Sequence, residues 1–283
     1  MNYKPIAKPR WEDMVVRPNL RDYEAAYQEF QWEPMQGGPA GLPGGGLNMA
    51  FESIDRHCLT WRKNKVALYW VGKDGTTEKY TFQELKYLTS RFANVLRGLG
   101  LQKGDRVFIF LGRIPELYVA AFGALKAGAV IGPLFSAFGP EAVRDRLQDS
   151  GATFLVTSPD LKERVEQIRS ELPELKHIIV VDRDHIGGTA LAPGETSYQE
   201  AMARSSREAD IARTTPEDYA IMHYTSGTTG KPKGAVHVHG AVQSQFATAK
   251  YILDIQEEDV YWCTADPGWV TGTSYGMFGP WSN

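Results

Sequence analysis

The order of apolar and polar positions predicts a chain that alternates between strands and helices. Apolar runs predict strands over 66–71, 106–111, 129–134, 153–157, 177–181 and 219–224. Helical periodicity predicts helices over 82–96, 116–127, 140–149 and 161–171. Helices of about 10 to 15 residues between strands indicate parallel β-α-β units with right-handed crossovers. We therefore expect an α/β fold of layered β-α-β units around a largely parallel sheet.

Local signals set several of these boundaries. Asp74 and Gly75 predict a hairpin turn between the strand at 66–71 and a second strand at 78–81. Thr81 and Glu84 have the spacing of a capping box, so the next helix begins after Thr81 and ends before Gly98. Residues 182–216 are polar and predict a loop with one short helix at 197–204.

The two ends of the chain differ from this pattern. Residues 34–46 are too rich in glycine and proline for a regular element, which predicts a flexible connector. We therefore divide the chain into a leader and connector at 1–46 and a main part at 47–283, which opens with a helix near Leu47. The last residues, 279–283, lie in an aromatic segment without a capping signal, so we expect the domain to be truncated there.

Composition and charge exclude several classes of protein. Of 283 residues, 42% are hydrophobic and 23% are charged, which is typical of a soluble globular protein. The formal charge of -3, without massed Lys or Arg, gives no indication of nucleic-acid binding. No signal peptide or membrane-spanning run of roughly 18 to 20 apolar residues is found, so we expect a cytoplasmic protein without a membrane partner. The two cysteines, Cys58 and Cys263, lie far apart in sequence and predict free thiols.

Residues 224–234, Tyr-Thr-Ser-Gly-Thr-Thr-Gly-Lys-Pro-Lys-Gly, carry the strongest chemical signal, and we call them the phosphate-loop segment. Glycines, hydroxyl groups and two lysines together favour the binding of a polyphosphate. The segment is not a Walker A loop, because only two residues separate Gly227 from Gly230 and a proline follows Lys231. Pro232 predicts instead a loop that turns back as a hairpin between two strands.

Other candidate residues carry weaker signals. His237 and His239 alternate on a predicted strand, which could suggest a metal pair, but no third ligand is close in sequence. We therefore predict no metal site in the chain and assign these histidines to holding the loop or contacting nucleotide. Asp266 is expected to be structural, and Cys263, without a nearby base, is expected to be a buried thiol.

The phosphate-loop segment resembles the hallmark loop of the acyl-adenylate-forming (AMP-binding) superfamily. In that superfamily the loop surrounds the β- and γ-phosphates of Mg·ATP, and Lys231 would balance phosphate charge as a catalytic residue. The resemblance runs from about residue 47 to the end of the chain and is closest to the acetyl-CoA synthetase-like members. It implies these cofactor-binding residues: Thr225, Ser226, Gly227, Thr228, Thr229, Gly230 and Lys231.

Residues 261–276, the acyl segment, resemble the acetyl-CoA synthetase form of the next segment of the family. By this resemblance Trp269, Val270 and Thr271 would line the acyl pocket, and a bulky indole would help to close it around a short acid. The alternative is that Trp269 is a core tryptophan.

Residues 135–147, the CoA segment, resemble the stretch that receives CoA in this branch. The resemblance implies that Phe135, Ser136 and Ala137 contact CoA, although two glycines are typical at positions 136 and 137. Arg144 and Arg146 could face the CoA phosphates or could be solvated helix arginines.

The resemblance implies a two-step reaction that uses ATP, Mg²⁺ and CoA. A carboxylate attacks the α-phosphorus of ATP and releases pyrophosphate, and the CoA thiol then takes the acyl group and releases AMP. Relatives of this kind are roughly twice as long, so we expect little or no synthetase activity from the 283-residue chain alone. The alternatives are a medium-chain or aryl acyl-CoA ligase, an adenylation domain that serves a carrier protein, and a short non-catalytic homologue with a binding role.

Overall fold

A computed structural model describes residues 7, 9–32, 35, 37–183, 191–225 and 232–283. Seven strands form one sheet in the order β7-β6-β5-β3-β4-β8-β9, and β1 and β2 form a separate hairpin. All neighbouring strands of the large sheet are parallel except β8 and β9. The strands are β1 Val66–Val71, β2 Thr77–Thr81, β3 Arg106–Phe110, β4 Val130–Pro133, β5 Phe154–Thr157, β6 His177–Val180, β7 Glu195–Ser197, β8 Tyr219–Thr225 and β9 Lys233–Val238.

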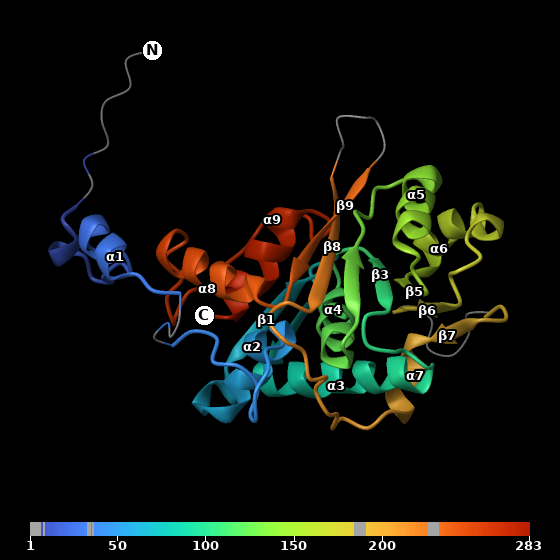
Figure 1. The fold of residues 1–283 in the computed structure, drawn as a ribbon, viewed down its shortest axis with the longest axis horizontal. Coiled ribbons are helices and arrows are strands. Elements are labelled where there is room, and N and C mark those ends of the chain that lie inside the picture. The colour runs from blue at the N-terminus through green and yellow to red at the C-terminus, as the bar shows by residue number, and fades with distance from the viewer. Residues whose placement is uncertain (1–6, 8, 33–34, 36, 184–190, 226–231) are drawn as a thin grey trace, which may run out of the picture.

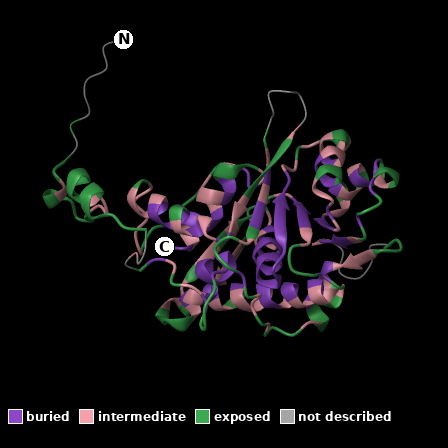
Figure 2. Ribbon diagram, in the orientation of Figure 1, coloured by how far each residue is buried: buried purple, intermediate pink, exposed green. Residues whose placement is uncertain are grey.

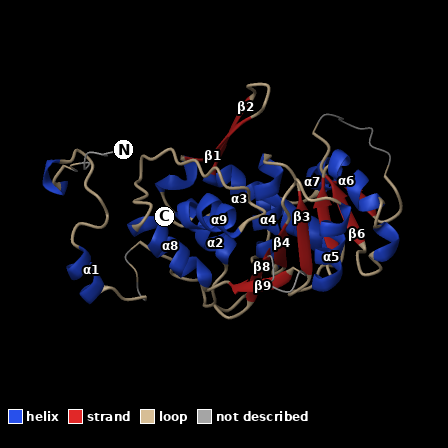
Figure 3. Ribbon diagram, turned by 90° about the horizontal axis from the view of Figure 1, so that it is seen from above, coloured by secondary structure: helices blue, strands red, loops and turns tan. Residues whose placement is uncertain are grey.

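Helices cover both faces of the large sheet, which confirms the α/β fold (Figures 1 and 3). The capping box predicted at Thr81 and Glu84 is present at the start of α3, where each side chain accepts a backbone N–H of the other residue. The helices are α1 Tyr23–Glu29, α2 Met49–Ser53, α3 Phe82–Gly98, α4 Pro115–Ala127, α5 Pro140–Ser150, α6 Pro159–Glu166, α7 Tyr198–Arg204, α8 Ala241–Tyr251, α9 Val270–Thr273 and α10 Gly279–Trp281.

The core lies in two layers on opposite faces of the sheet. Alternate residues of β3 point to opposite faces, because side chains along a strand have a period of two. Val107 and Ile109 join the cluster packed under α3 and α4, whereas Phe108 and Phe110 join the cluster packed under α5 and α6. Figure 2 shows this buried interior running along the central strands and α4.

One element of the sheet departs from the sequence prediction. Residues 182–216 were expected to contain a loop and one helix, but Glu195–Ser197 forms β7 and pairs with β6 at the edge of the sheet. This strand has three polar, partly exposed residues, so it carries no apolar pattern that could reveal it. Ser197 then caps α7 by accepting the backbone N–H of Glu200.

The described part of the connector is bonded to the rest of the molecule. The backbone N–H of Gly41 donates to the Glu52 carboxylate at 2.7 Å. The Arg213 guanidinium donates to the carbonyl oxygens of Pro43 and Gly45. As predicted, 37–46 contains no helix or strand, but these contacts differ from the flexible connector that the composition predicts. Before the connector, α1 lies apart from the sheet (Figure 1).

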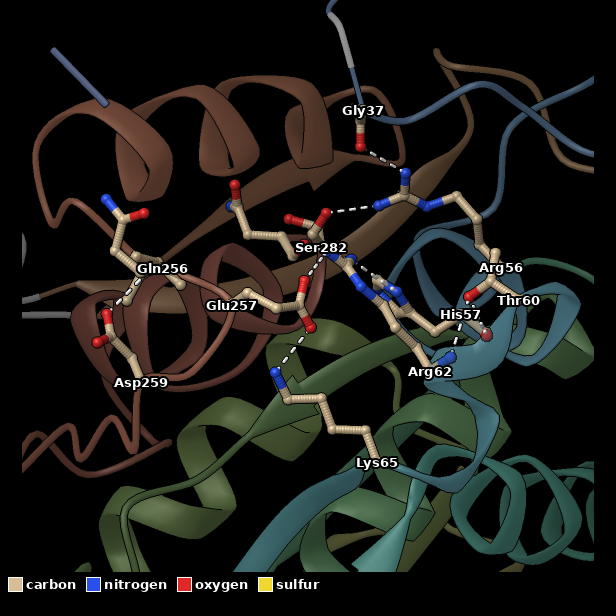
Figure 4. A network of polar contacts seen from close by, with 12 residues as sticks. Gly37, Arg56, His57, Thr60, Arg62, Lys65, Gln256, Glu257, Asp259 and Ser282 are labelled. Atoms are coloured by element: carbon tan, nitrogen blue, oxygen red, sulfur yellow. Dashed lines mark hydrogen bonds and ion pairs between the residues drawn. The ribbon is translucent and has the colours of Figure 1, made fainter. Parts of the chain in front are cut away.

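A basic cluster holds the last residues against the start of the main part (Figure 4). Arg56 donates to the carbonyl oxygen of Ser282, and Arg62 donates to that of Asn283 at 2.6 Å. Arg62 and Lys65 also form ion pairs with Glu257. The segment around Arg62 and Lys65 is therefore joined to the Glu257 carboxylate and, through Arg62, to Asn283.

Among the described residues, no helix is both long enough and apolar enough to cross a membrane.

Candidate active site

The phosphate-loop segment begins and ends in the β8–β9 hairpin. Thr225 is opposite Lys233 and Tyr224 is opposite Gly234 in the antiparallel register, so the predicted hairpin is confirmed. Thr225, the last residue of β8, is exposed. The other predicted phosphate ligands lie outside the described residues: Ser226, Gly227, Thr228, Thr229, Gly230 and Lys231.

Tyr224 connects the base of this hairpin to α5. Its hydroxyl donates to the Asp149 carboxylate at 2.7 Å, and burial together with this acceptor raises the tyrosine pKa. The Arg146 guanidinium lies 5.7 Å from the centre of the Tyr224 ring and 4.2 Å from that of Phe138. Such cation–π contacts stabilise rings and cation most when both are desolvated.

Arg146 is therefore not one of the solvated helix arginines considered from sequence. It is buried, its Nη1 donates to the carbonyl oxygen of Ala142 at 2.7 Å, and its Nε has no hydrogen-bond partner among the described residues. Arg144, by contrast, forms ion pairs with the partly exposed carboxylates of Asp145 and Glu171. The structure thus separates two arginines that the sequence could not distinguish.

The CoA segment leaves the carboxyl end of β4. Phe135, Ser136 and Ala137 form the turn between β4 and α5. Arg164, on α6, donates from Nη1 to the carbonyl oxygens of Ser136 and Phe138, at 2.8 and 2.9 Å. This arginine fixes the backbone of the turn, although the sequence did not indicate it.

The acyl segment contacts the CoA segment directly. The Trp269 ring lies 5.6 Å from that of Phe135 and 6.2 Å from that of Phe138. A Cβ atom added at Gly268 would lie 2.4 Å from the backbone nitrogen of Phe135, so the two backbones touch and only glycine fits. Trp269 therefore packs against the predicted CoA residue Phe135, and Val270 and Thr271 follow it at the start of α9.

Trp269 is 46% exposed, which excludes the core tryptophan considered from sequence. Asp266 holds the turn before it, as expected of a structural residue. Its carboxylate accepts the Gly268 N–H at 2.8 Å, and its carbonyl oxygen accepts the Trp269 N–H at 2.9 Å. Arg113 forms an ion pair with the same carboxylate at 3.3 Å.

The histidines near the hairpin do not converge on one point. β9 ends at Val238, and Nδ1 of buried His239 accepts the backbone N–H of Met49 at 3.0 Å. Burial lowers the pKa of His239 to about 4. His237 instead lies near His223 on β8, with 6.0 Å between ring centres. No group of three or more His, Cys, Asp or Glu residues in the described part of the chain is arranged to hold a metal ion.

Comparison with known proteins decides the family. A model of the AMP-binding enzyme family matches residues 54–283. The chain belongs to the AMP-binding enzyme family. It is 49% identical over 267 residues to an acetyl-coenzyme A synthetase of Bacillus subtilis (strain 168), covering 94% of this chain and 45% of that protein. It is 37% identical over 283 residues to an acetyl-coenzyme A synthetase of Methanothrix thermoacetophila, covering 95% and 42%.

A solved structure of the same kind confirms the fold. The crystal structure of an acyl-CoA synthetase from Brucella canis matches with a TM-score of 0.82 and 30% sequence identity, covering 92% of this chain and 46% of that one. The chain thus spans about half the length of the relatives that it matches.

In this member of the AMP-binding enzyme family, three separate segments reach one end of the sheet. The CoA segment follows β4, the phosphate-loop segment follows β8, and the acyl segment contacts the first of these. The carboxyl ends of parallel strands are the usual position for ligand sites in α/β sheets. Two residues near this site were missed by sequence reasoning, because each contacts a segment distant in sequence. Arg164 donates to the turn that contains Ser136, and buried His223 on β8 lies 2.8 Å from the hydroxyl of Thr273 on α9.

Proposed function

We propose that the complete protein is an AMP-forming acid–CoA ligase that activates a short, acetate-like carboxylic acid. The acid carboxylate attacks the α-phosphorus of ATP, forming an acyl-adenylate and pyrophosphate. The CoA thiol then attacks the acyl carbonyl, forming the acyl-CoA with AMP as the leaving group. We further propose that the 283-residue chain has little or no synthetase activity alone.

One observation carries this proposal: the backbone contact between Gly268 and Phe135. Acyl transfer to CoA needs the acyl group and the thiol at the same place, because positioning supplies much of the rate. The contact brings the segment proposed to line the acyl pocket against the segment proposed to receive CoA. The names of the similar acetyl-coenzyme A synthetases support the same assignment.

Each segment has a distinct role in the proposal. Residues 225–231 hold the β- and γ-phosphates, with Lys231 balancing their charge. Trp269, Val270 and Thr271 line the acyl pocket, while Phe135, Ser136 and Ala137 contact CoA. No covalent enzyme nucleophile takes part, so the chain's task is to orient the reactants and neutralise phosphate charge.

Magnesium enters this proposal with the nucleotide. Mg²⁺ commonly binds substrate phosphates together with one or two carboxylates rather than a full protein cage. The ion would neutralise phosphate charge, and exposed Thr225 at the end of β8 would offer a hydroxyl to the bound nucleotide.

The test is acid-dependent exchange of pyrophosphate into ATP, followed by thioester formation with CoA. Acids from acetate through butyrate to benzoate are compared, using both the 283-residue chain and the complete product of its gene. We expect exchange with the shortest acids from the complete product and little from the chain. Strong exchange by the chain alone, or none by either protein with any acid, contradicts the proposal.

A second candidate is a ligase for medium-chain or aryl acids. The exposure of the Trp269 indole favours it, because an indole that is 46% exposed does not by itself close a small pocket. A preference for benzoate or longer acids over acetate in the same experiment would select this candidate.

A further inference from the structure

A buried hydrogen bond joins the strand before the phosphate loop to the acyl segment. Nε2 of His223, on β8, lies 2.8 Å from Oγ1 of Thr273, on α9. The two residues are 2% and 0% exposed. His223 precedes Thr225 by two positions, and Thr273 follows Thr271 by two positions. The bond therefore connects two predicted substrate sites through the protein interior.

The surroundings of Thr273 decide which group donates. Its Oγ1 is also 3.0 Å from the carbonyl oxygen of Val270, which can only accept. A hydroxyl has one proton, so both contacts are satisfied when Thr273 donates to Val270 and the imidazole donates from Nε2–H. Burial, with a smaller contribution from His237, lowers the pKa of His223 to about 4, so the ring is neutral at pH 7.

Other contacts of the acyl segment join it to α8 and to the CoA segment rather than to β8. Tyr275 donates to the hydroxyl of Thr248, and Gln245 donates to that of Ser274, so the π-helical segment Ser274–Phe278 after α9 is tied to α8. Gly268 packs on Phe135, which ties the start of the acyl segment to the CoA segment. Among the described residues, the hydrogen bond between His223 and Thr273 runs from α9 to the strand carrying the phosphate loop.

We propose that His223 is a positioning residue that acts through Thr273 to set the acyl pocket relative to the phosphates of ATP. The inference rests on the proposed function, because the carboxylate held by 269–271 must meet the α-phosphorus of a nucleotide held by 225–231. A displacement of about 1 Å at such a site can lower the rate about a hundredfold. His223 contacts neither reactant in this scheme.

The experiment removes the Thr273 hydroxyl while keeping the side-chain shape. Thr273→Val is compared with Thr273→Ser, which keeps the hydroxyl, in the complete product of the gene. His223→Gln, whose amide keeps a donor near the Nε2 position, is compared with His223→Phe. Thr89→Val is the control, because Thr89 is equally buried and its hydroxyl donates only within α3, at 2.7 Å to the carbonyl oxygen of Leu85.

We expect Thr273→Val to lower kcat/KM for the acid in pyrophosphate exchange by about tenfold or more, with the Kd of Mg·ATP unchanged in the absence of acid. Thr273→Ser and His223→Gln should keep most of the activity, and Thr89→Val should retain that of the wild type. Equal losses in Thr273→Val and Thr89→Val, or a parallel loss of Mg·ATP affinity, would overturn the inference. Absence of exchange in the wild type would instead overturn the proposed function, and the inference with it.

Discussion

The central strands and the β8–β9 hairpin belong to one sheet but are stabilised differently. β4 and β5 are buried along their whole length, and β3 is buried except at its first residue. In β9, the residues Lys233–Val236 are exposed, and the strand is attached through its antiparallel backbone pairing with β8. Burial on both faces stabilises the fold, whereas the exposed edge presents the predicted phosphate loop. The buried central strands therefore stabilise the fold, whereas the predicted chemistry lies at the exposed β8–β9 edge.

The largest effect is expected where α4 packs over the central strands. Nζ of Lys126 is fully buried and lies 2.9 Å from the Asp55 carboxylate. Lys126→Ala leaves this carboxylate buried without its cation, so we expect the free energy of unfolding to fall by about 3–5 kcal/mol. Urea denaturation followed by circular dichroism measures the change.

The same substitution in the hairpin is the matched control. Lys233 is exposed at the start of β9, so Lys233→Ala should change the free energy of unfolding by less than about 0.5 kcal/mol. Replacing both charges, as Asp55→Leu with Lys126→Met, should recover most of the lost stability. Similar losses from Lys126→Ala and Lys233→Ala would contradict the comparison.

Acid is expected to lower the stability of the protein partly through two buried histidines on β8 and just after β9. Burial lowers the pKa values of His223 and His239 to about 4, from an ordinary value of 6.5. Because the folded-state pKa lies below the unfolded-state value, the unfolded protein binds the proton first as the pH falls. The free energy of unfolding therefore keeps its full value above pH 6.5 and decreases as the pH falls toward 4. Each histidine contributes up to about 1.4 kcal/mol for each pH unit in this window.

Urea denaturation at several pH values between 7 and 4.5 tests this effect. His239→Gln should make the loss of stability with falling pH less steep than in the wild type. Burial also lowers the pKa of His57 to about 4, and this histidine is present in both proteins. It therefore contributes part of the pH dependence of the free energy of unfolding that remains in His239→Gln. An unchanged slope in His239→Gln would show that its imidazole does not stay neutral in the folded state.

A smaller effect is expected where the CoA and acyl segments touch. Gly268→Ala places a Cβ atom 2.4 Å from the backbone nitrogen of Phe135, so one backbone must move. We expect a loss of about 1–3 kcal/mol in the free energy of unfolding and a lower rate of thioester formation. Gly112→Ala is the control, because no atom lies within 4 Å of its added Cβ. A stable Gly268→Ala protein with wild-type thioester formation would contradict the close contact.

The smallest effect is expected at the base of the hairpin. Tyr224→Phe removes the hydrogen bond to Asp149 but keeps the ring beside Arg146 and Phe108. We expect a loss of about 0.5–1.5 kcal/mol, measured as a shift of the urea midpoint. Tyr219→Phe on the same strand, where the side chain is 64% exposed, should shift the midpoint less.

The sequence was sufficient for most of the fold because burial leaves a local pattern. The run at 106–111 predicts β3, and Thr81 with Glu84 predicts the start of α3. β7 was missed because a short polar edge strand is stabilised by pairing with β6 rather than by its own residues. The resemblance supplied the three site segments, but the pocket-closing role of Trp269 stays a prediction.

The contacts between those segments could not be predicted. His223 and Thr273 are 50 positions apart, and neither belongs to a local pattern that requires the other. Likewise, nothing in the local sequence around Gly268 indicates that the fold places the Phe135 backbone against it. Distances of this kind follow from tertiary packing, which a single sequence does not display.

The contact between Gly268 and Phe135 has a consequence for redesign of acid selectivity. Because the two backbones touch, widening the turn at 266–268 would displace the predicted CoA segment along with the proposed acyl pocket. The Trp269 side chain is 46% exposed and contacts Phe135 and Phe138 through its ring, so we expect that it can be shortened without moving either backbone. A programme that aims to accept longer acids would therefore vary position 269 first and leave position 268 as glycine.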